Sequence, residues 1–201
     1  MLGKRATERS PLSLTPRWAS LYVRPSWIAY DDARVLYLTH PQSLGDLLPE
    51  QPTYRADQLR NWLYTTPVLT ADHMSNLPTA LRRSLQERLW PFTVSAEQVG
   101  DKGLTRKWLF QVQDGASIEA VLMGYARRTS ICISSQAGCA LACTFCATGQ
   151  FGFKRHLEAG EIVAQVAYAR AFLREIGMPG APSHLTNVVF MGMGEPLAHF
   201  D

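Results

Sequence analysis

The chain has 201 residues, of which 46% are hydrophobic and 18% are charged, and its net charge is +3. These values are typical of a globular protein and exclude a disordered chain, and no apolar run approaches the roughly 20 residues that cross a bilayer. The basic segment 1–20 is not followed by an apolar core, which excludes a secretory signal. We therefore expect a cytoplasmic protein, without a membrane partner, built as one sizeable domain or one domain and a small appendage.

The N-terminal half predicts two regions. Residues 1–50 are expected to form a poorly defined extension, because five prolines interrupt every short apolar run. Residues 51–91 predict a helical module, since apolar residues recur at helical spacing over 54–66 and again over 76–90. The excess of basic residues also lies in this half of the chain. A docked polyanion would explain that excess, although solvated helix faces explain it more simply.

The apolar spacing then changes to a period of two. Residues 106–125 predict two strands around Asp114-Gly115, a strong hairpin signal. We therefore expect residues 92–128 to form a β-hairpin connector.

The last part of the chain predicts a single βαβ unit. The expected order is a β-rich run at 128–135, a loop that contains cysteines, a helix over 157–177 and an apolar strand at 187–191. A unit of this kind cannot bury both faces of its sheet, so we expect residues 129–201 to be a truncated domain.

All four cysteines lie between residues 132 and 146. Cys139, Cys143 and Cys146 have the spacing C-x3-C-x2-C, and Cys132 stands seven residues before the first of them. Disulfides are disfavoured because the thiols are clustered and no secretory signal precedes them. A structural zinc site would need Cys132 to close it from within a predicted strand. The third alternative is an iron–sulfur cluster held by three thiolates, with its fourth iron open to a small molecule.

Two motifs together resemble the radical S-adenosylmethionine (SAM) superfamily. "CALACTFC" follows a predicted strand and precedes a helix, and "GMGEP" at 192–196 ends the next strand. The wider stretches "ICISSQAGCALACTFCATGQFGFKRHLEAGEIVAQV" and "NVVFMGMGEPL" are similar to the radical SAM rRNA adenine methyltransferases. This resemblance extends from about residue 54 to residue 201. It implies an α/β fold in which a small helical module and a β-hairpin precede the first βαβ unit of a truncated radical SAM partial (β/α) barrel.

The resemblance also implies a function and cofactors. The family methylates C2 of an adenine in 23S rRNA, with tRNA as an expected second substrate, by a radical mechanism that uses SAM and a [4Fe–4S] cluster. Flavodoxin or ferredoxin is the kind of electron donor expected. A C8-specific relative, another radical SAM enzyme and a non-catalytic truncated remnant remain alternatives.

Roles follow from the positions that match the family. Cys139, Cys143 and Cys146 match the cluster ligands, and Gly194 and Glu195 match the contacts to the methionine amino group of SAM. Two further residues match catalytic positions, namely Glu119 and Cys132.

Glu119 matches the family's proton-handling glutamate, although period-two alternation alone would make it a solvent-facing strand residue. Cys132 matches the cysteine that resolves the covalent RNA adduct, and its simpler explanation is a small buried side chain. The family also uses a methyl-carrying cysteine near its C-terminus, and no cysteine follows Cys146 here. We therefore expect an N-terminal fragment. Four basic residues of the helical module are candidates for RNA phosphate contacts: Arg60, Arg82, Arg83 and Arg88.

Overall fold

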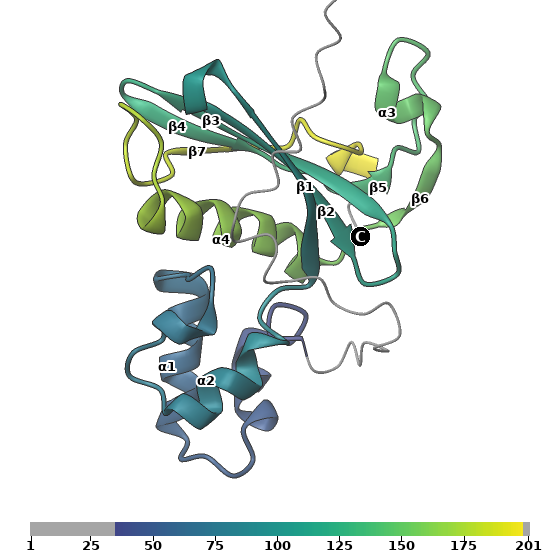
Figure 1. Ribbon diagram of the computed structural model, residues 1–201. Coiled ribbons are helices and arrows are strands. Elements are labelled where there is room, and N and C mark those ends of the chain that lie inside the picture. The colour runs from purple at the N-terminus through teal and green to yellow at the C-terminus, as the bar shows by residue number, and fades with distance from the viewer. Residues whose placement is uncertain (1–34, 199–201) are drawn as a thin grey trace, which may run out of the picture.

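The computed structural model describes residues 35–198, and Figure 1 shows their arrangement. The N-terminal part is a small helical module. It consists of the 3₁₀ helix η3 (Pro41–Leu47), α1 (Tyr54–Arg60) continued by the π-helical turn η4 (Asn61–Thr65), the 3₁₀ turn η5 (Ala71–His73) and α2 (Thr79–Gln86).

Both predicted helices of the module are present. The segment formed by α1 and η4 buries Leu59 and Leu63, as the helical spacing predicted. The second helix is shorter than expected: it begins after Pro78, which is its N-cap, and ends at Gln86. Leu85 and Leu89 are nevertheless both buried, so the apolar stripe continues into the turn that follows α2.

Residues 35–48 belong to the folded module. Val35, Leu36, Tyr37, Leu44 and Leu48 are buried, and Pro41 stands at the start of η3 rather than breaking a helix. The expectation of weak structure over residues 1–50 is therefore wrong for this stretch, because its short apolar runs pack against the module helices. The remainder of that expected extension, residues 1–34, lies outside the described residues.

The sheet has the strand order β1-β2-β3-β4-β7. Its strands are β1 (Phe92–Gly100), β2 (Thr105–Val112), β3 (Ser117–Tyr125), β4 (Arg128–Cys132) and β7 (Asn187–Val189), and a 3₁₀ turn, η6 (Asp101–Gly103), joins β1 to β2. The first four strands pair antiparallel, and β4 pairs with β7 in parallel. The predicted hairpin and βαβ unit are therefore present, and they share one sheet that is mostly antiparallel.

Strand β1 was not expected. A bulge between Val94 and Ala96 shifts its pairing with β2, so the apolar residues of β1 do not keep a period of two. After the bulge Glu97 faces the protein interior, where its Oε1 accepts hydrogen bonds from Arg106 (2.9 Å) and from Trp108 Nε1 (3.2 Å).

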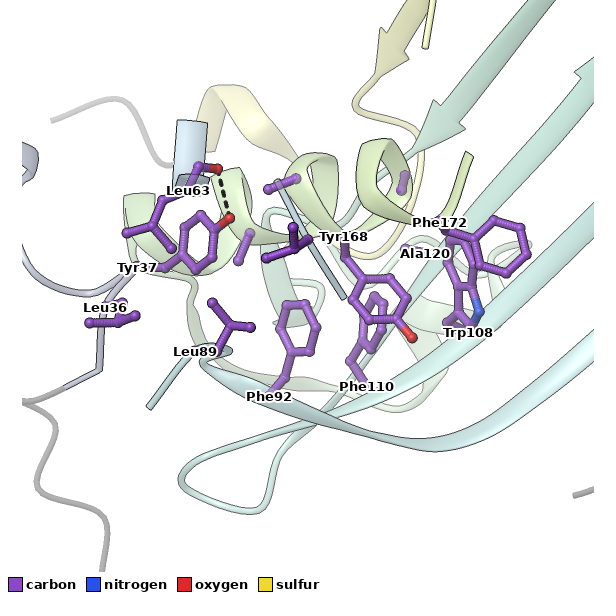
Figure 2. Packing of buried hydrophobic residues seen from close by; sticks show 14 of the residues in the cluster. Leu36, Tyr37, Leu63, Leu89, Phe92, Trp108, Phe110, Ala120, Tyr168 and Phe172 are labelled. Carbon is purple, nitrogen blue, oxygen red and sulfur yellow. Dashed lines mark hydrogen bonds between the residues drawn. The ribbon is translucent and has the colours of Figure 1, made fainter. Parts of the chain in front are cut away.

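Helix α4 (Ala159–Glu175) covers one face of the sheet. Tyr168 and Phe172 lie against Trp108 with ring centroids 5.2 Å apart in both pairs, and Figure 2 shows how these rings pack with Phe92 and Phe110. A capping box begins the helix, and Gly177, in the left-handed region at φ +77°, follows its end, as the sequence predicted. Among residues 35–198, no helix has both the length and the apolar composition that a bilayer crossing needs.

Polar contacts join the helical module to α4. Arg170 donates to the carbonyl oxygens of Tyr64 and Thr65 (2.8 Å each), and the Tyr37 hydroxyl donates to the carbonyl of Leu63 (2.8 Å). These three carbonyls end the α1–η4 segment and have no partner within it, so the contacts cap that segment. The two bonds from Arg170 also fix the module against α4.

Candidate functional site

The two predicted motifs meet at the carboxyl ends of adjacent parallel strands. Strand β4 leads through β5 (Gln136–Gly138) into the cysteine loop, and β7 leads into the glycine-rich turn 192–196. The backbone N–H groups of Ser135 and Gln136 both donate to the carbonyl of Met193, at 2.9 and 3.2 Å. The structure thus brings the start of the cysteine loop into direct contact with the turn.

A two-stranded ribbon closes the cysteine loop at its base. Strand β5 pairs with β6 (Phe153–His156), and the N–H of Cys139 donates to the carbonyl of Gly152 at 3.1 Å. Gly138 is in the left-handed region at φ +82°, and a Cβ at this position would lie 1.9 Å from the Gly152 oxygen. A side chain at residue 138 would therefore push β5 and β6 apart at the base of the loop.

The three loop cysteines are free thiols with partly exposed side chains. Gly149 packs against the backbone of Cys143, where a Cβ would lie 2.8 Å from the nitrogen and 2.9 Å from the oxygen. Cys146 is the N-cap of the short helix α3 (Ala147–Gln150). Backbone N–H groups of Gly149 and Thr148 donate to its sulfur, and they lower the pKa of the Cys146 thiol.

The donor set of the loop consists of three thiols. Within residues 35–198, no three His, Cys, Asp or Glu side chains converge closely enough to hold one metal ion. A tetrahedral zinc site needs such convergence. A cluster has several iron atoms, so its cysteine ligands need not converge on one point. Three soft thiol ligands on one partly exposed loop are the donors that such a cluster takes.

The turn that contains Gly194 and Glu195 packs tightly against β5. Gly194 has φ +100°, and a Cβ there would lie 2.6 Å from the Cβ of Gln136, so only glycine fits. The N–H of Glu195 donates to Gln136 Oε1 at 3.3 Å, and its own Oε1 accepts from the N–H of Leu197 at 3.0 Å. The carboxylate is thus partly exposed at the surface of the turn, beside the cysteine loop.

Glu119 and Cys132 share the face of the sheet that is opposite α4. Cys132 pairs with Val121, two residues along β3 from Glu119, and alternation places all three side chains on one face. Lys107 pairs with Glu119 (Nζ–Oε1 2.6 Å), and both side chains are 39% exposed. Burial raises the pKa of the Cys132 thiol, against the opposing effect of the N–H of Met191.

The four arginines lie away from the cysteine loop. They belong to the helical module, which Figure 1 shows on the other side of α4 from the sheet. Two of them make contacts within the module: Arg60 donates to the carbonyl of Pro41 and pairs with Asp57, and Arg82 donates to the carbonyl of Asp72. Arg83 is exposed, and Arg88 is partly buried.

Three buried polar residues that organise the site were not predicted from the sequence. Ser134, Gln136 and Gln165 are each 0% exposed. Gln165 on α4 bonds both the N–H and the carbonyl of Ser134, at 2.9 and 3.0 Å. The Ser134 hydroxyl donates to the carbonyl of Glu119 at 2.7 Å and accepts from the N–H of Met193 at 2.9 Å. The available signal was the polar triplet "SSQ" directly after an apolar strand, because buried polar groups need partners.

Comparison with known proteins places these features in one family. Residues 47–90 match the family described as "Ribosomal RNA large subunit methyltransferase N-terminal domain". A protein of Chloroflexus aurantiacus named "Probable dual-specificity RNA methyltransferase RlmN" is 48% identical over 175 residues, which cover 85% of this chain and 46% of that protein. The protein of the same name from Roseiflexus castenholzii is 44% identical, with 75% of this chain and 46% of that protein covered.

One solved structure is similar over most of the chain. The crystal structure of a radical SAM methyltransferase from Sphaerobacter thermophilus is 44% identical and has a TM-score of 0.71, covering 83% of this chain and 48% of that one. The chain therefore spans just under half the length of the relatives that it matches.

Proposed function

The chain belongs to the RlmN family of RNA methyltransferases, and we propose that it forms the part of such an enzyme that binds the cluster and the methionine end of SAM. The activity that we propose for the whole enzyme is methylation of C2 of an adenine in 23S rRNA and in tRNA. One observation carries this proposal: the cysteine loop and the Gly194-Glu195 turn lie together at the carboxyl ends of β4 and β7, where Met193 bonds the start of the loop.

The proposed cofactor roles use five residues. Cys139, Cys143 and Cys146 would hold a [4Fe–4S] cluster, which when bound supplies the electron for cleavage of SAM. Glu195 would accept hydrogen bonds from the amino group of the methionine moiety, since a carboxylate complements an ammonium. Gly194 lets the backbone of the turn come close both to β5 and to this ligand.

We propose that Glu119 and Cys132 act on the RNA. Both face away from α4, and the main chain of Glu119 is bonded to the start of the cysteine loop through Ser134. Glu119 would transfer the proton of the methylated adenine, with Lys107 holding its carboxylate in place. Cys132 would resolve the covalent adduct as a thiolate, so its thiol must first lose a proton. Burial opposes this step, because it raises the pKa of the Cys132 thiol.

We propose that the helical module, residues 51–91, binds RNA. Arg83 is the strongest phosphate-contact candidate, because it is exposed on α2. Arg60 and Arg82 would first have to exchange their contacts with backbone carbonyls, and Arg88 is half-buried. The proposed compartment is the cytoplasm, where ribosomes and tRNA are found, and the proposed electron donor is a flavodoxin or ferredoxin.

Anaerobic reconstitution with iron and sulfide tests the cofactor assignment. The wild-type chain should turn brown, with broad absorbance near ~400 nm from iron–sulfur charge transfer. Cys143→Ala should lose that absorbance. Cys132→Ala is the matched control and should keep it, because Cys132 lies in β4 outside the loop. A colourless protein that holds one zinc ion, or equal cluster loss in both variants, would contradict the assignment.

A further inference from the structure

The side chain of Gln136 connects the two motifs. It is 0% exposed and lies in β5, between the cysteine loop and the glycine-rich turn. Its Oε1 accepts the N–H of Ala140, directly after Cys139, and also the N–H of Glu195, at 3.3 Å in each case. One amide oxygen therefore bonds both the loop that carries the thiols and the turn that carries the carboxylate.

The hydrogen bonds fix the orientation of this amide. Two N–H donors converge on one atom of the side chain, so that atom must be the oxygen. The amide nitrogen then faces Nδ1 of His156 on β6, at 3.2 Å. Since the nitrogen donates, His156 Nδ1 is the acceptor in this arrangement. From the first strand of the ribbon, Gln136 thus contacts the cysteine loop, the second strand of the ribbon and the turn that follows β7.

The surroundings of Gln136 are rigid on the side of the sheet. Gln165 on α4 is hydrogen-bonded to the backbone of Ser134, just after β4. The Ser134 hydroxyl is in turn hydrogen-bonded to β3 and to the turn after β7. The cysteine loop has no comparable anchor in its own side chains, since Leu141 is 55% exposed and Phe145 is 91% exposed. Its position relative to the turn therefore depends on the base of the loop, where Gln136 sits.

We propose that Gln136 is a positioning residue, which sets the distance and orientation between the cluster loop and the SAM-binding turn. This proposal rests on the proposed function. SAM has to contact the loop, through the cluster, and the turn at the same time. A loop that can move relative to the turn loses entropy on binding, so the affinity for SAM falls while the three thiols can still take up the cluster.

Two variants and a neighbouring control test the role. Gln136→Met has a similar volume but cannot accept either N–H. Gln136→Glu keeps an acceptor for both N–H groups, and it is a partial rescue because its carboxylate cannot donate the hydrogen bond to His156 Nδ1. Ser135→Ala is the matched control, because the buried Ser135 hydroxyl has no hydrogen-bond partner among the described residues, while its backbone makes the same contact to Met193.

The measurements are iron and sulfide content and the Kd for SAM in the reconstituted chain, with amide hydrogen exchange in the cluster-free chain. Gln136→Met should keep its iron content and bind SAM about tenfold more weakly, from the loss of the two hydrogen bonds that join the loop to the turn, each of modest net strength. Exchange should rise in segments 139–146 and 192–198 together and stay unchanged in α4. Ser135→Ala should remain near wild type in every measurement, and Gln136→Glu should lie between it and Gln136→Met.

Two outcomes would overturn the role of Gln136. One is a Kd of Gln136→Met within about twofold of Ser135→Ala, which is too small for the loss of two hydrogen bonds. The other is faster exchange in only one of the two segments. If Gln136→Met does not fold, Gln136→Asn takes its place, since its shorter side chain cannot reach both N–H groups. If the wild type takes no cluster, the proposed function fails, and the exchange experiment still decides whether Gln136 couples the segments.

Discussion

Arg155 on β6 is the residue whose removal should weaken the base of the cysteine loop most. Its guanidinium bonds both oxygens of Glu161 in the first turn of α4, at 2.7 and 2.8 Å. It also bonds Asp114 in the turn between β2 and β3, at 2.5 Å. The Glu161 side chain is 3% exposed, that of Arg155 is 30% exposed and that of Asp114 is 46% exposed. Replacement by methionine removes both ion pairs and keeps most of the aliphatic stem.

The two ion pairs contribute unequally. Breaking a buried pair by removing one partner costs about 3–5 kcal/mol, whereas an exposed pair contributes about 0–1 kcal/mol. Arg155 is partly solvated, and Glu161 keeps one donor, the N–H of Glu158 at 2.9 Å. We therefore expect Arg155→Met to lower the free energy of unfolding by about 2 kcal/mol, mostly through the unpaired carboxylate. For a chain of this size, that loss lowers Tm by about 4–8 °C.

A double-mutant cycle with Glu161→Gln checks the mechanism by urea denaturation. Glu161→Gln keeps an acceptor for the helix cap and should cost about 1 kcal/mol. The double variant should be about as stable as Glu161→Gln, because no buried charge is then left unpaired. Lys154→Met is the control, since Lys154 is an exposed cation on the same strand. Additive single losses in the double variant, or a loss in Lys154→Met as large as that in Arg155→Met, would contradict the role of the unpaired Glu161 carboxylate.

Three further predictions concern other parts of the chain. Tyr37→Phe removes the buried hydrogen bond to the Leu63 carbonyl (2.8 Å) and should cost about 1–2 kcal/mol in urea denaturation; no measurable loss would show that the module is not capped there. Gly138→Ala should cost at least about 2 kcal/mol and Gly115→Ala about 1 kcal/mol, because both have positive φ but only the Cβ at 138 meets a backbone atom. In a variant whose three loop cysteines are alanine, alkylation of Cys132 should reach half its maximal rate above the pH of about 8.5 at which a free thiol does so, because burial raises its pKa; a lower midpoint would contradict that environment.

Local signals predicted several of the elements that the structure contains, among them α4 and the β2–β3 hairpin. The helix over 157–177 has an apolar face and a terminal glycine, and α4 agrees with the prediction within two residues at each end. The Asp114-Gly115 pair predicted the β2–β3 hairpin. The loop has three residues, 113–115, because Val112 pairs with Ala116, and Gly115 takes up the left-handed conformation at its end, at φ +81°. Both features depend on residues that are close together in the sequence, so they can be predicted without knowledge of the tertiary structure.

The features that the sequence did not predict depend mostly on tertiary pairing. Strand β1 has a bulge and a buried Glu97, whose partners lie on β2, so alternation alone does not reveal it. The antiparallel pairing of β3 with β4 makes one sheet of the hairpin and the βαβ unit. It is a tight hairpin, and the sequence did not predict it because its two connecting residues, Ala126 and Arg127, are not of the types that usually mark a turn. Gln136 belongs to this group, since its hydrogen bond from the N–H of Glu195 is recognised only when the turn after β7 is placed beside β5.

The buried base of the site and the exposed cysteine loop at its tip have different roles, as a physical consequence of these pairings. The base is assembled from buried polar side chains with defined partners, and it joins β3, β4, the turn after β7 and α4. The tip carries the thiols on a loop whose large apolar residues, Phe145 and Phe151, are 91% and 80% exposed. A loop of this kind gains little from packing, so its order has to come from its closure at the base and from the ligands that it binds. Substitutions at the base should therefore change how tightly ligands are held, whereas substitutions of the thiols should decide whether the cluster is held at all.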